Sequence, residues 1–307
     1  FTREVRRAAL GIGDDCALLA PTAGMQLAVS SDMLVEGRHF LSTVAPDRLG
    51  HKALAVNLSD LAACGAQPLG FTLALALPRA DEVFLEGFAR GLFALAELQG
   101  IELVGGDTTQ GPLNICITAM GEVPPGQALL RSGARVGDEL YVSGTVGDAR
   151  LALEVFRGQL ALEAAAFESV RAAMERPQPR VALGLALRGI ATSAIDVSDG
   201  LLGDLGHVLR RSGVGAVVDV DAVPRSAVLA AQTQAWQREC TLAGGDDYEL
   251  IFTAPAASAD AVQAAARRAG VAATRIGRIE AGATLRLVDA AGRPVAHTFG
   301  SFDHFRS

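Results

Sequence analysis

The chain has 307 residues, of which 50% are hydrophobic, and its formal net charge is −7. This length and composition predict two domains with substantial cores, whereas the negative charge argues against a nucleic-acid surface, which needs clustered Lys and Arg. No apolar run reaches the roughly 18–20 residues that span a bilayer, and the N-terminus does not lead into a signal-peptide core. We therefore expect a soluble, cytoplasmic protein that binds neither nucleic acid nor membranes.

The first half of the chain alternates strands and helices. Strands are predicted at residues 25–31, 69–77 and 113–123, and helices at residues 47–64 and 81–99. The strand at 69–77 alternates large apolar residues with small ones, so neither of its faces is polar. A sheet without a polar face must be covered on both sides, and we expect one of the two covers to be a partner subunit.

A polar, glycine-rich connector near residue 136 predicts a domain boundary, with domains at 1–136 and 137–307. Beyond it the predicted elements are, in chain order, a strand at 139–143, helices at 152–156, 166–176 and 181–189, a strand at 193–198, a helix at 199–213, a strand within 244–255 and a helix at 262–270. The helix at 199–213 follows a strand and a tight turn. That arrangement aims the N–H groups at a helix N-terminus toward an anion.

Six short segments that contain Asp recur along the chain, most of them with Gly or Ser, and we expect them to lie at turns. They are GIGDD at 11–15, SSD at 30–32, NLSD at 57–60, VGGDT at 104–108, IDVSDG at 195–200 and GGDD at 244–247. Helix capping would explain any one of them, but six together predict a site for Mg²⁺ and for the phosphate groups that share its coordination. Several follow apolar runs, so we expect the carboxylates to converge at one end of a sheet.

Other classes of site lack their motifs. The only lysine, Lys52, follows His51, so the chain has neither a P-loop nor the protein-kinase motifs. A calcium loop that began at Asp196 would need Glu where His207 stands. The four cysteines form no CxxC pair, and no dinucleotide or nucleophile-elbow motif occurs. Phosphate groups must therefore be handled by metal ions, Arg and backbone N–H groups.

Taken together, these segments resemble the thiamine-monophosphate kinase family. The match rests on GIGDDCALL, SSDMLVEGRHF, HKALAVNLSDLAACGAQP, LVGGDTT, RSGARVGD, SAIDVSDGLLGDLGH, GGDDYEL and the tail FDHF. It covers almost the whole chain in the expected order. It implies ATP-dependent phosphorylation of thiamine monophosphate to thiamine diphosphate. It also implies the aminoimidazole-ribonucleotide synthetase-like fold, with two α+β domains and N-terminal sheets that pair across a homodimer.

The resemblance also implies roles for individual residues. Binding of several Mg²⁺ ions is implied for Asp15, Ser30, Ser31, Asp32, Asp60, Asp107, Asp196 and Asp199. Contacts with ATP are implied for Gly106, Asp107, Arg131 and Ser198. Contacts with thiamine monophosphate are implied for His39, Asp246 and Phe302. We expect catalysis to centre on Asp32, Asp60, Asp107 and Arg131, which position and neutralise the transferring phosphoryl group.

Asp246 stands where family members usually have Glu, so its carboxylate reaches one methylene less far. Two alternatives share the Asp pattern: another ATP-using synthetase of the same superfamily, and a protein that binds Mg-nucleotide without turnover. The segments VEGRHF and FDHF favour the kinase over the synthetase. Release of ADP that depends on thiamine monophosphate would separate the three.

Overall fold

The computed structural model describes residues 1, 3, 5–296, 299 and 300, and the chain divides into two compact units. The N-terminal unit comprises residues 1–61 and 66–128, and the C-terminal unit comprises residues 62–65 and the chain from 129 onward. The connector between 129 and 136 belongs to the C-terminal unit, because Ala134 is part of that unit's buried core. Among the helices of the described chain, none has the length and hydropathy needed to cross a membrane.

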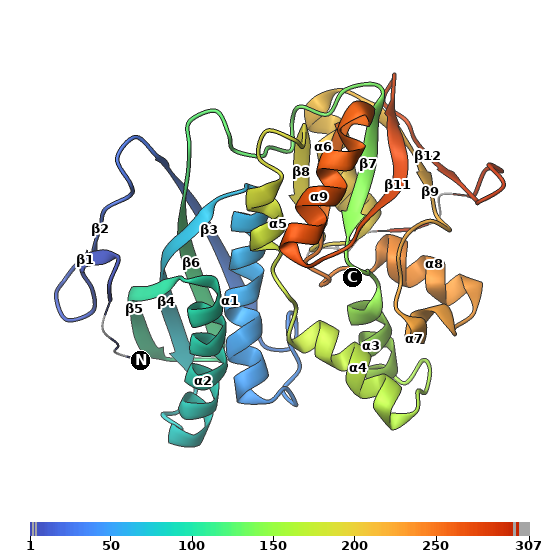
Figure 1. Ribbon diagram of the computed structural model, residues 1–307. Helices are drawn as coiled ribbons and strands as arrows, with labels where there is room; N and C mark the ends of the chain where they lie inside the picture. Colours follow the sequence, from blue (N-terminus) through green and yellow to red (C-terminus); the bar gives the residue numbers. More distant parts are fainter. Residues whose placement is uncertain (2, 4, 297–298, 301–307) are drawn as a thin grey trace. The chain divides into compact units, whose positions relative to one another are not determined.

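The N-terminal unit is built on a four-stranded sheet that two helices cover (Figure 1). Its strands lie in the order β3 (Gln26–Val35), β6 (Asn114–Val123), β4 (Gln67–Leu77) and β5 (Glu102–Gln110). The pair of β4 and β5 is parallel, and the other neighbours are antiparallel. The remaining elements are the strands β1 (Ala8–Leu10) and β2 (Leu18–Leu19) and the helices α1 (Pro46–Ala63) and α2 (Glu82–Gln99).

The two faces of this sheet differ in exposure. On β4, the side chains under the helices are at most 6% exposed; they are Phe71, Leu73, Leu75 and Leu77. The opposite side, which we call the open face, carries Thr72, Ala74 and Ala76 of β4 together with Leu27 (47% exposed), Val29 (60%) and Met33 (54%) of β3. The alternation of large and small residues predicted for 69–77 is therefore confirmed, and the small residues lie on an exposed apolar surface.

The C-terminal unit contains a six-stranded mixed sheet. Its strands lie in the order β12 (Leu285–Val288), β9 (Gly215–Asp219), β11 (Ala273–Glu280), β7 (Asp138–Ser143), β10 (Leu250–Pro255) and β8 (Ser193–Asp196). Only the pair of β12 and β9 is parallel among these described strands. The helices are α3 (Asp148–Phe156), α4 (Ala164–Glu175), α5 (Val181–Ala186), α6 (Leu201–Ser212), α7 (Ala227–Ala230), α8 (Gln234–Ala243) and α9 (Ala259–Ala269).

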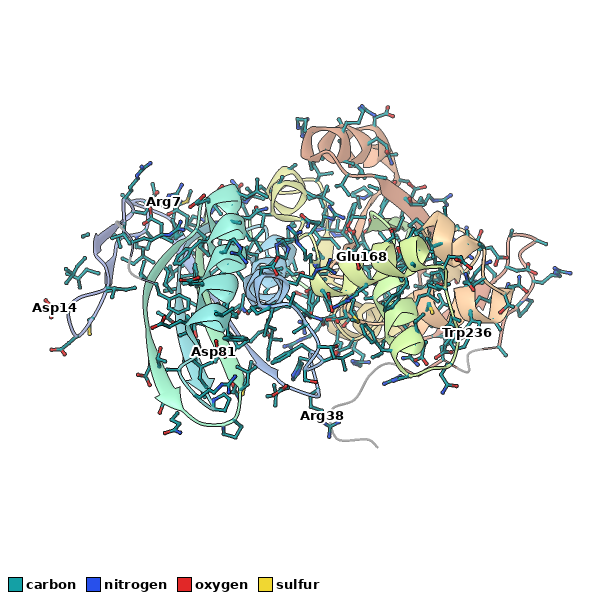
Figure 2. All side chains as sticks on the ribbon, turned by 90° about the horizontal axis from the view of Figure 1, so that it is seen from below. Arg7, Asp14, Arg38, Asp81, Glu168 and Trp236 are labelled. Carbon is teal, nitrogen blue, oxygen red and sulfur yellow. The ribbon has the colours of Figure 1, made fainter. Side chains whose placement is uncertain are left out.

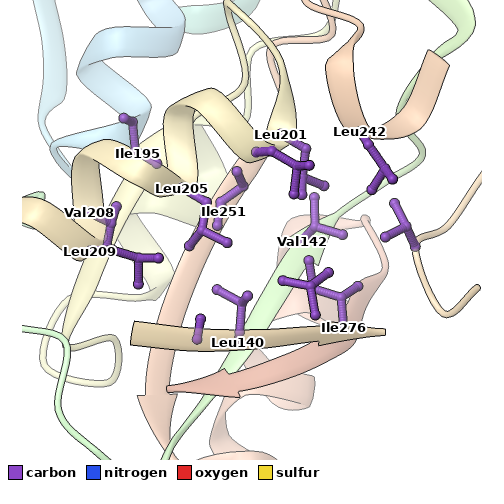
Figure 3. Close-up of a cluster of buried hydrophobic side chains, with 14 of the residues drawn as sticks. Leu140, Val142, Ile195, Leu201, Leu205, Val208, Leu209, Leu242, Ile251 and Ile276 are labelled. Atoms are coloured by element: carbon purple, nitrogen blue, oxygen red, sulfur yellow. The ribbon is translucent and has the colours of Figure 1, made fainter. Parts of the chain in front are cut away.

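The core of the C-terminal unit lies between this sheet and α6 (Figure 3). Leu201, Leu205 and Val208 on one face of α6 are at most 1% exposed and pack in the same cluster as Val142 of β7. Burial of each such side chain contributes about 1.5–3 kcal/mol. The apolar face predicted for 199–213 is confirmed, but the helix begins at Leu201 because Gly200 has a φ of 122°, outside the helical region. This packing fixes the end of the loop that joins β8 to α6.

Candidate functional site

A first group of candidate residues lies where α1 packs against β3. The Ser30 hydroxyl donates a hydrogen bond to the Asp60 carboxylate. Three residues earlier on α1, Asn57 Oδ1 accepts the N–H of Asp32 at 3.1 Å, and Asn57 Nδ2 donates to the Ala53 carbonyl at 3.0 Å. Residues three apart share one face of a helix. Asn57 and Asp60 therefore tie α1 to β3 next to Ser30 and Asp32.

Neighbouring residues of a strand face opposite sides of the sheet. Ser30 and Asp32 are half-buried on the side of α1, whereas Ser31 is exposed on the open face. On β5, Asp107 is paired with Ala74 of the open face and is also exposed. The predicted Mg²⁺ ligands on the strands of this unit therefore divide between two faces of one sheet.

The prediction that the Asp segments lie at turns is wrong for three of them. Asp32 lies within β3, Asp60 within α1 and Asp107 within β5. The glycines before Asp107 are typical turn residues, but Gly106 serves a contact between strands: a Cβ there would lie 2.0 Å from the Leu73 carbonyl oxygen of β4. A glycine within a strand allows this close approach of two backbones.

The candidate carboxylates of the N-terminal unit lie on different elements. The strands that carry Asp32 and Asp107 are separated by β6 and β4. Asp15 is exposed between β1 and β2, where Asp14 Oδ1 accepts its N–H at 2.8 Å; Figure 2 shows Asp14 on that loop. Throughout the residues that the structure describes, no group of three His, Cys, Asp or Glu side chains is placed to hold a metal ion.

His39 closes the turn that follows β3. Its Nδ1 accepts the Val35 N–H at 3.0 Å, and its own N–H donates to the Val35 carbonyl at 3.0 Å. When the imidazole is neutral, Nδ1 is therefore the acceptor and Nε2 carries the ring proton. The half-buried ring thus has a fixed orientation and an N–H donor on its other nitrogen.

A second group lies in the C-terminal unit, on the loop that joins β8 to α6. Asp196 ends β8 and is 4% exposed, and Ser198 and Asp199 follow it. The carboxylate of Asp204, in the first turn of α6, accepts the N–H groups of Ser198, Asp199 and Gly200 at 3.1, 3.0 and 3.1 Å. A carboxylate of the protein therefore accepts the N–H groups of the turn that precedes α6. The prediction that the N–H groups of the first helical residues face an anion stays a prediction.

The carboxyl group of Asp204 has an unusual environment. Its pKa is raised to about 7, and burial is the largest cause. The N–H donors of the loop act in the opposite direction, and the negative charge of Asp199 adds to the increase. The loop thus holds two acidic side chains close together before any ligand is considered.

The segment that contains Asp246 packs against the same loop. The N–H of Asp246 donates to the Ser198 carbonyl at 2.8 Å, and the N–H of Tyr248 donates to the Val197 carbonyl at 2.9 Å. Asp246 has a φ of 72° and Tyr248 a φ of 53°, left-handed conformations that are uncommon in residues other than glycine and concentrate at functional sites. The structure therefore brings Asp246 next to Ser198, and the hydrogen bonds of the loop support the strained backbone.

Asp247, between Asp246 and Tyr248, is half-buried; it lies in the predicted segment GGDD, but the sequence assigned it no role. Both of its carboxylate oxygens accept the Gly147 N–H at 2.9 Å. Burial raises the pKa of Asp247 well above its usual range, and the neighbouring carboxylates of Asp148, Glu249 and Asp246 raise it as well. Asp247 therefore anchors the turn to the start of α3.

Arg131 lies near the same loop. The Ser212 hydroxyl donates to the Arg131 carbonyl at 3.2 Å and so fixes the connector to the end of α6. Burial, Arg210 and Arg131 lower the pKa of His207, whereas Asp199 raises it. The charges of Arg131 and Asp199 thus both act on His207 of α6.

The C-terminal unit therefore gathers most of its candidates around one loop. These candidates are Asp196, Ser198, Asp199, Arg131 and Asp246. Phe302 lies outside the described residues. Sequence reasoning missed the side chains that hold the candidates in place, namely Asn57, Asp204 and Asp247. For Asn57 a signal exists, because its spacing from Asp60 in NLSD places both on one helical face.

The fold and the two groups of residues define the class of protein. The chain matches the family models of the AIR synthase related protein, N-terminal domain, over residues 13–123 and of the AIR synthase related protein, C-terminal domain, over residues 135–290. It is therefore a two-domain protein of the AIR synthase-related class.

Similar proteins of known name show to which family within this class the chain belongs. The chain is 47% identical to the thiamine-monophosphate kinase of Salmonella typhimurium (strain LT2) over 298 residues, which cover 96% of this chain and 91% of the relative. It is 43% identical to the thiamine-monophosphate kinase of Haemophilus influenzae over 305 residues, which cover 97% and 92% of the two chains. The chain belongs to the thiamine-monophosphate kinase family, as the sequence motifs predict.

Solved structures agree with this assignment. The crystal structure of the thiamine-monophosphate kinase from Stenotrophomonas maltophilia K279a is 49% identical, with a TM-score of 0.88 over 94% of this chain and 92% of that one. A complex of AaThiL with AMPPCP and TMP is 29% identical, with a TM-score of 0.79 over 93% and 89%. The hydrogenase maturation protein HypE in complex with ATP, at 21% identity and a TM-score of 0.77, shares the fold. The predicted two-domain α+β fold is confirmed.

Proposed function

We propose that this protein transfers the γ-phosphoryl group of ATP to the phosphate of thiamine monophosphate, giving thiamine diphosphate and ADP. The observation that carries the proposal is the similarity to thiamine-monophosphate kinases, which extends over both units and 96% of the chain. The structure of AaThiL with AMPPCP and TMP is a relative of the same fold. Identification of ADP and thiamine diphosphate as the products is the direct test.

We propose that several Mg²⁺ ions bind together with ATP. The donors of both groups are carboxylate and hydroxyl oxygens, the hard ligands that Mg²⁺ prefers. Mg²⁺ usually takes one or two carboxylates and completes its shell with water and substrate phosphates. The proposed ligands are Asp15, Ser30, Ser31, Asp32, Asp60, Asp107, Asp196 and Asp199.

The ions supply charge neutralisation at the transferring phosphoryl group. The acceptor is a phosphate monoester whose second pKa is near 6, so it is already a nucleophilic dianion at neutral pH and needs no general base from the protein. The chain's own residues then bind and align the two substrates. We assign Arg131 to an ATP phosphate, because its planar guanidinium forms two parallel hydrogen bonds with such oxygens. Gly106, Asp107 and Ser198 complete the proposed nucleotide contacts.

We further propose that both domains act on one pair of substrates. In this assignment residues 1–136 provide metal and ATP binding and dimerisation, and residues 137–307 complete the ATP and substrate site. The substrates are small phosphates rather than nucleic acid, in line with the net charge of −7. We place the reaction in the cytoplasm.

We propose a homodimer in which the open faces of two N-terminal sheets pair. Its support is the exposure of Leu27, Val29 and Met33 beside the small residues of β4. Ala74→Arg would bury a charge in this contact at a cost of several kcal/mol. The expected result in light scattering is a dimeric wild type and a monomeric variant.

The control for this prediction is Leu98→Arg, since Leu98 is 72% exposed on α2 and away from the open face. That variant should remain dimeric. A monomeric wild type, or an Ala74→Arg variant that dimerises as tightly as the wild type, would contradict the proposed interface.

We propose that His39, Asp246 and Phe302 contact thiamine monophosphate. Asp246→Asn and Phe302→Ala are expected to raise KM for thiamine monophosphate by about two- to thirtyfold. A contact between a cation and an aromatic face contributes roughly 0.5–2 kcal/mol, and the charge of a carboxylate that contacts a cation contributes a similar amount. Asn suits position 246, because Asn tolerates the left-handed backbone at φ 72°. KM for ATP should stay nearly constant. Equal changes in both KM values would place these residues at the phosphates or in the core.

A further inference from the structure

The carboxylate of Asp204 has an arrangement that the proposed reaction leaves unexplained. One of its oxygens, Oδ2, accepts three successive backbone N–H groups, those of Ser198, Asp199 and Gly200. Asp204 is 3% exposed, so this contact is shielded from water. Gly200 precedes the first residue of α6, so the N–H groups of Ser198 and Asp199 belong to the loop. Asp204 therefore does more than cap its own helix.

The carbonyl side of the same loop is held by a different segment. The Val197 carbonyl accepts the Tyr248 N–H at 2.9 Å, and the Ser198 carbonyl accepts the Asp246 N–H at 2.8 Å. The Val197 N–H donates to the Glu249 carbonyl at 2.8 Å. Residues 197–200 are thus fixed by a carboxylate on their N–H side and by residues 246–249 on the other side.

The approach of the two segments leaves little freedom. A Cβ at Gly245 would lie 2.2 Å from the Ser198 carbonyl oxygen, and a Cβ at Gly200 would lie 2.9 Å from the Ala243 carbonyl oxygen. The loop and the segment that carries Asp246 therefore meet backbone to backbone, and only glycine fits at these two positions. Since the backbone N–H groups of 198–200 are bonded inside the protein, the side chains of Ser198 and Asp199 are the groups that this loop offers to a ligand.

We propose that Asp204 is a positioning residue. It fixes the loop so that Asp196, Ser198 and Asp199 bind Mg-nucleotide next to Asp246. A carboxylate can accept several backbone N–H groups at once, so an acidic side chain suits this task. Residues that orient metal ligands without touching the metal typically change metal affinity or activity by 10–100-fold when mutated. The role assigned to Asp204 rests on the proposed kinase function.

The first test needs no catalysis. In Asp204→Ala the 198–200 amides should lose protection from hydrogen exchange by at least about tenfold, because each loses its buried hydrogen-bond acceptor. The exchange is measured by mass spectrometry without Mg²⁺ or nucleotide. Asp204→Asn keeps an oxygen acceptor and should retain part of the protection. Unchanged protection in Asp204→Ala would overturn the proposal.

The second test uses the Mg²⁺ concentration for half-maximal formation of thiamine diphosphate. We expect a rise of about 10–100-fold in Asp204→Ala and a smaller rise, about threefold, in Asp204→Asn, because a neutral acceptor weakens the three bonds without removing them. If Asp204→Ala does not fold, hydrogen exchange and the Mg²⁺ requirement are both measured on Asp204→Asn. An unchanged Mg²⁺ requirement in a folded variant would reduce Asp204 to a structural residue.

The matched control is Asp138→Ala. Asp138 is also buried in the C-terminal unit, at 4% exposure, and accepts the Arg135 N–H at 2.9 Å and the Thr192 hydroxyl at 2.6 Å. Its loss should lower stability and leave both the 198–200 amides and the Mg²⁺ requirement unchanged. Equal shifts in the two variants would contradict a specific role for Asp204. A wild type without kinase activity would instead refute the proposed function, and hydrogen exchange would still test the loop contact.

Discussion

Thiamine diphosphate formation is expected to stop completely in excess chelator and to return when Mg²⁺ is restored. ATP and a phosphate monoester repel each other and also repel carboxylates, so their approach needs cations between them. Mg²⁺ usually keeps several water ligands and takes only one or two protein carboxylates, so we expect ions that exchange readily with solution. Loss and recovery should therefore be fast.

The same account predicts the form of the Mg²⁺ dependence. When several ions must be bound at once, the rate should rise more than linearly with free Mg²⁺ at low concentration. The measurement is the initial rate at fixed ATP and thiamine monophosphate across a Mg²⁺ series. Full activity in excess chelator would refute a mechanism that uses several metal ions.

Asp107→Asn is expected to lower kcat by at least about a hundredfold, as for loss of a charge that positions a catalytic ion. Asp107 is exposed on β5, so the substitution creates no cavity and breaks no buried contact, and the unfolding temperature should be unchanged. Asp107 is paired with Ala74 of the open face. Light scattering must therefore accompany the kinetics, to show that the variant remains in the same oligomeric state as the wild type.

Glu102→Gln is the control for this prediction. Glu102 is an acidic residue on the same strand, and its carboxylate accepts the N–H groups of Arg6 and Arg7 at the other end of β5. Its removal should leave kcat within about twofold, as is usual for substitutions away from a site. A near-normal kcat in Asp107→Asn would remove that residue from the site, whereas equal losses in both variants would indicate a general defect of β5.

The sequence predicts the elements whose evidence is local. The apolar residues of 201–212 recur with the helical period of 3.6 residues, and large and small residues alternate in β4. Both patterns depend on residues close in the chain, and the structure confirms the helix and the strand that they predict. The sequence wrongly predicts Asp107 at a turn, because the glycines before it are typical turn residues. Here the need for Gly106 comes from Leu73 of β4, 33 residues earlier, which only tertiary structure brings near.

In the candidate site, too, local sequence predicts some features, whereas others depend on tertiary contacts. Motifs point to Ser198 and Asp246, but their contact joins positions 48 residues apart, and no local pattern predicts it. Ser30 and Ser31 lie within the predicted strand, whose alternation places them on opposite faces. Asp32 lies in the strand rather than at a turn because β3 continues to Val35, past its predicted end at residue 31. The sequence does not single out Asp204, because an acidic residue in the first turn of a helix is common. Its role depends on which N–H groups of the folded loop point toward it.

The central claim is tested most directly by product analysis of the wild-type protein with ATP, Mg²⁺ and thiamine monophosphate. We predict that ADP and thiamine diphosphate form in equal amounts, and that ADP release without thiamine monophosphate is negligible. Mass spectrometry identifies the phosphorylated product, and a coupled assay gives the rate of ADP release. ADP release that is independent of thiamine monophosphate, or nucleotide binding without any turnover, would contradict the assignment as a kinase.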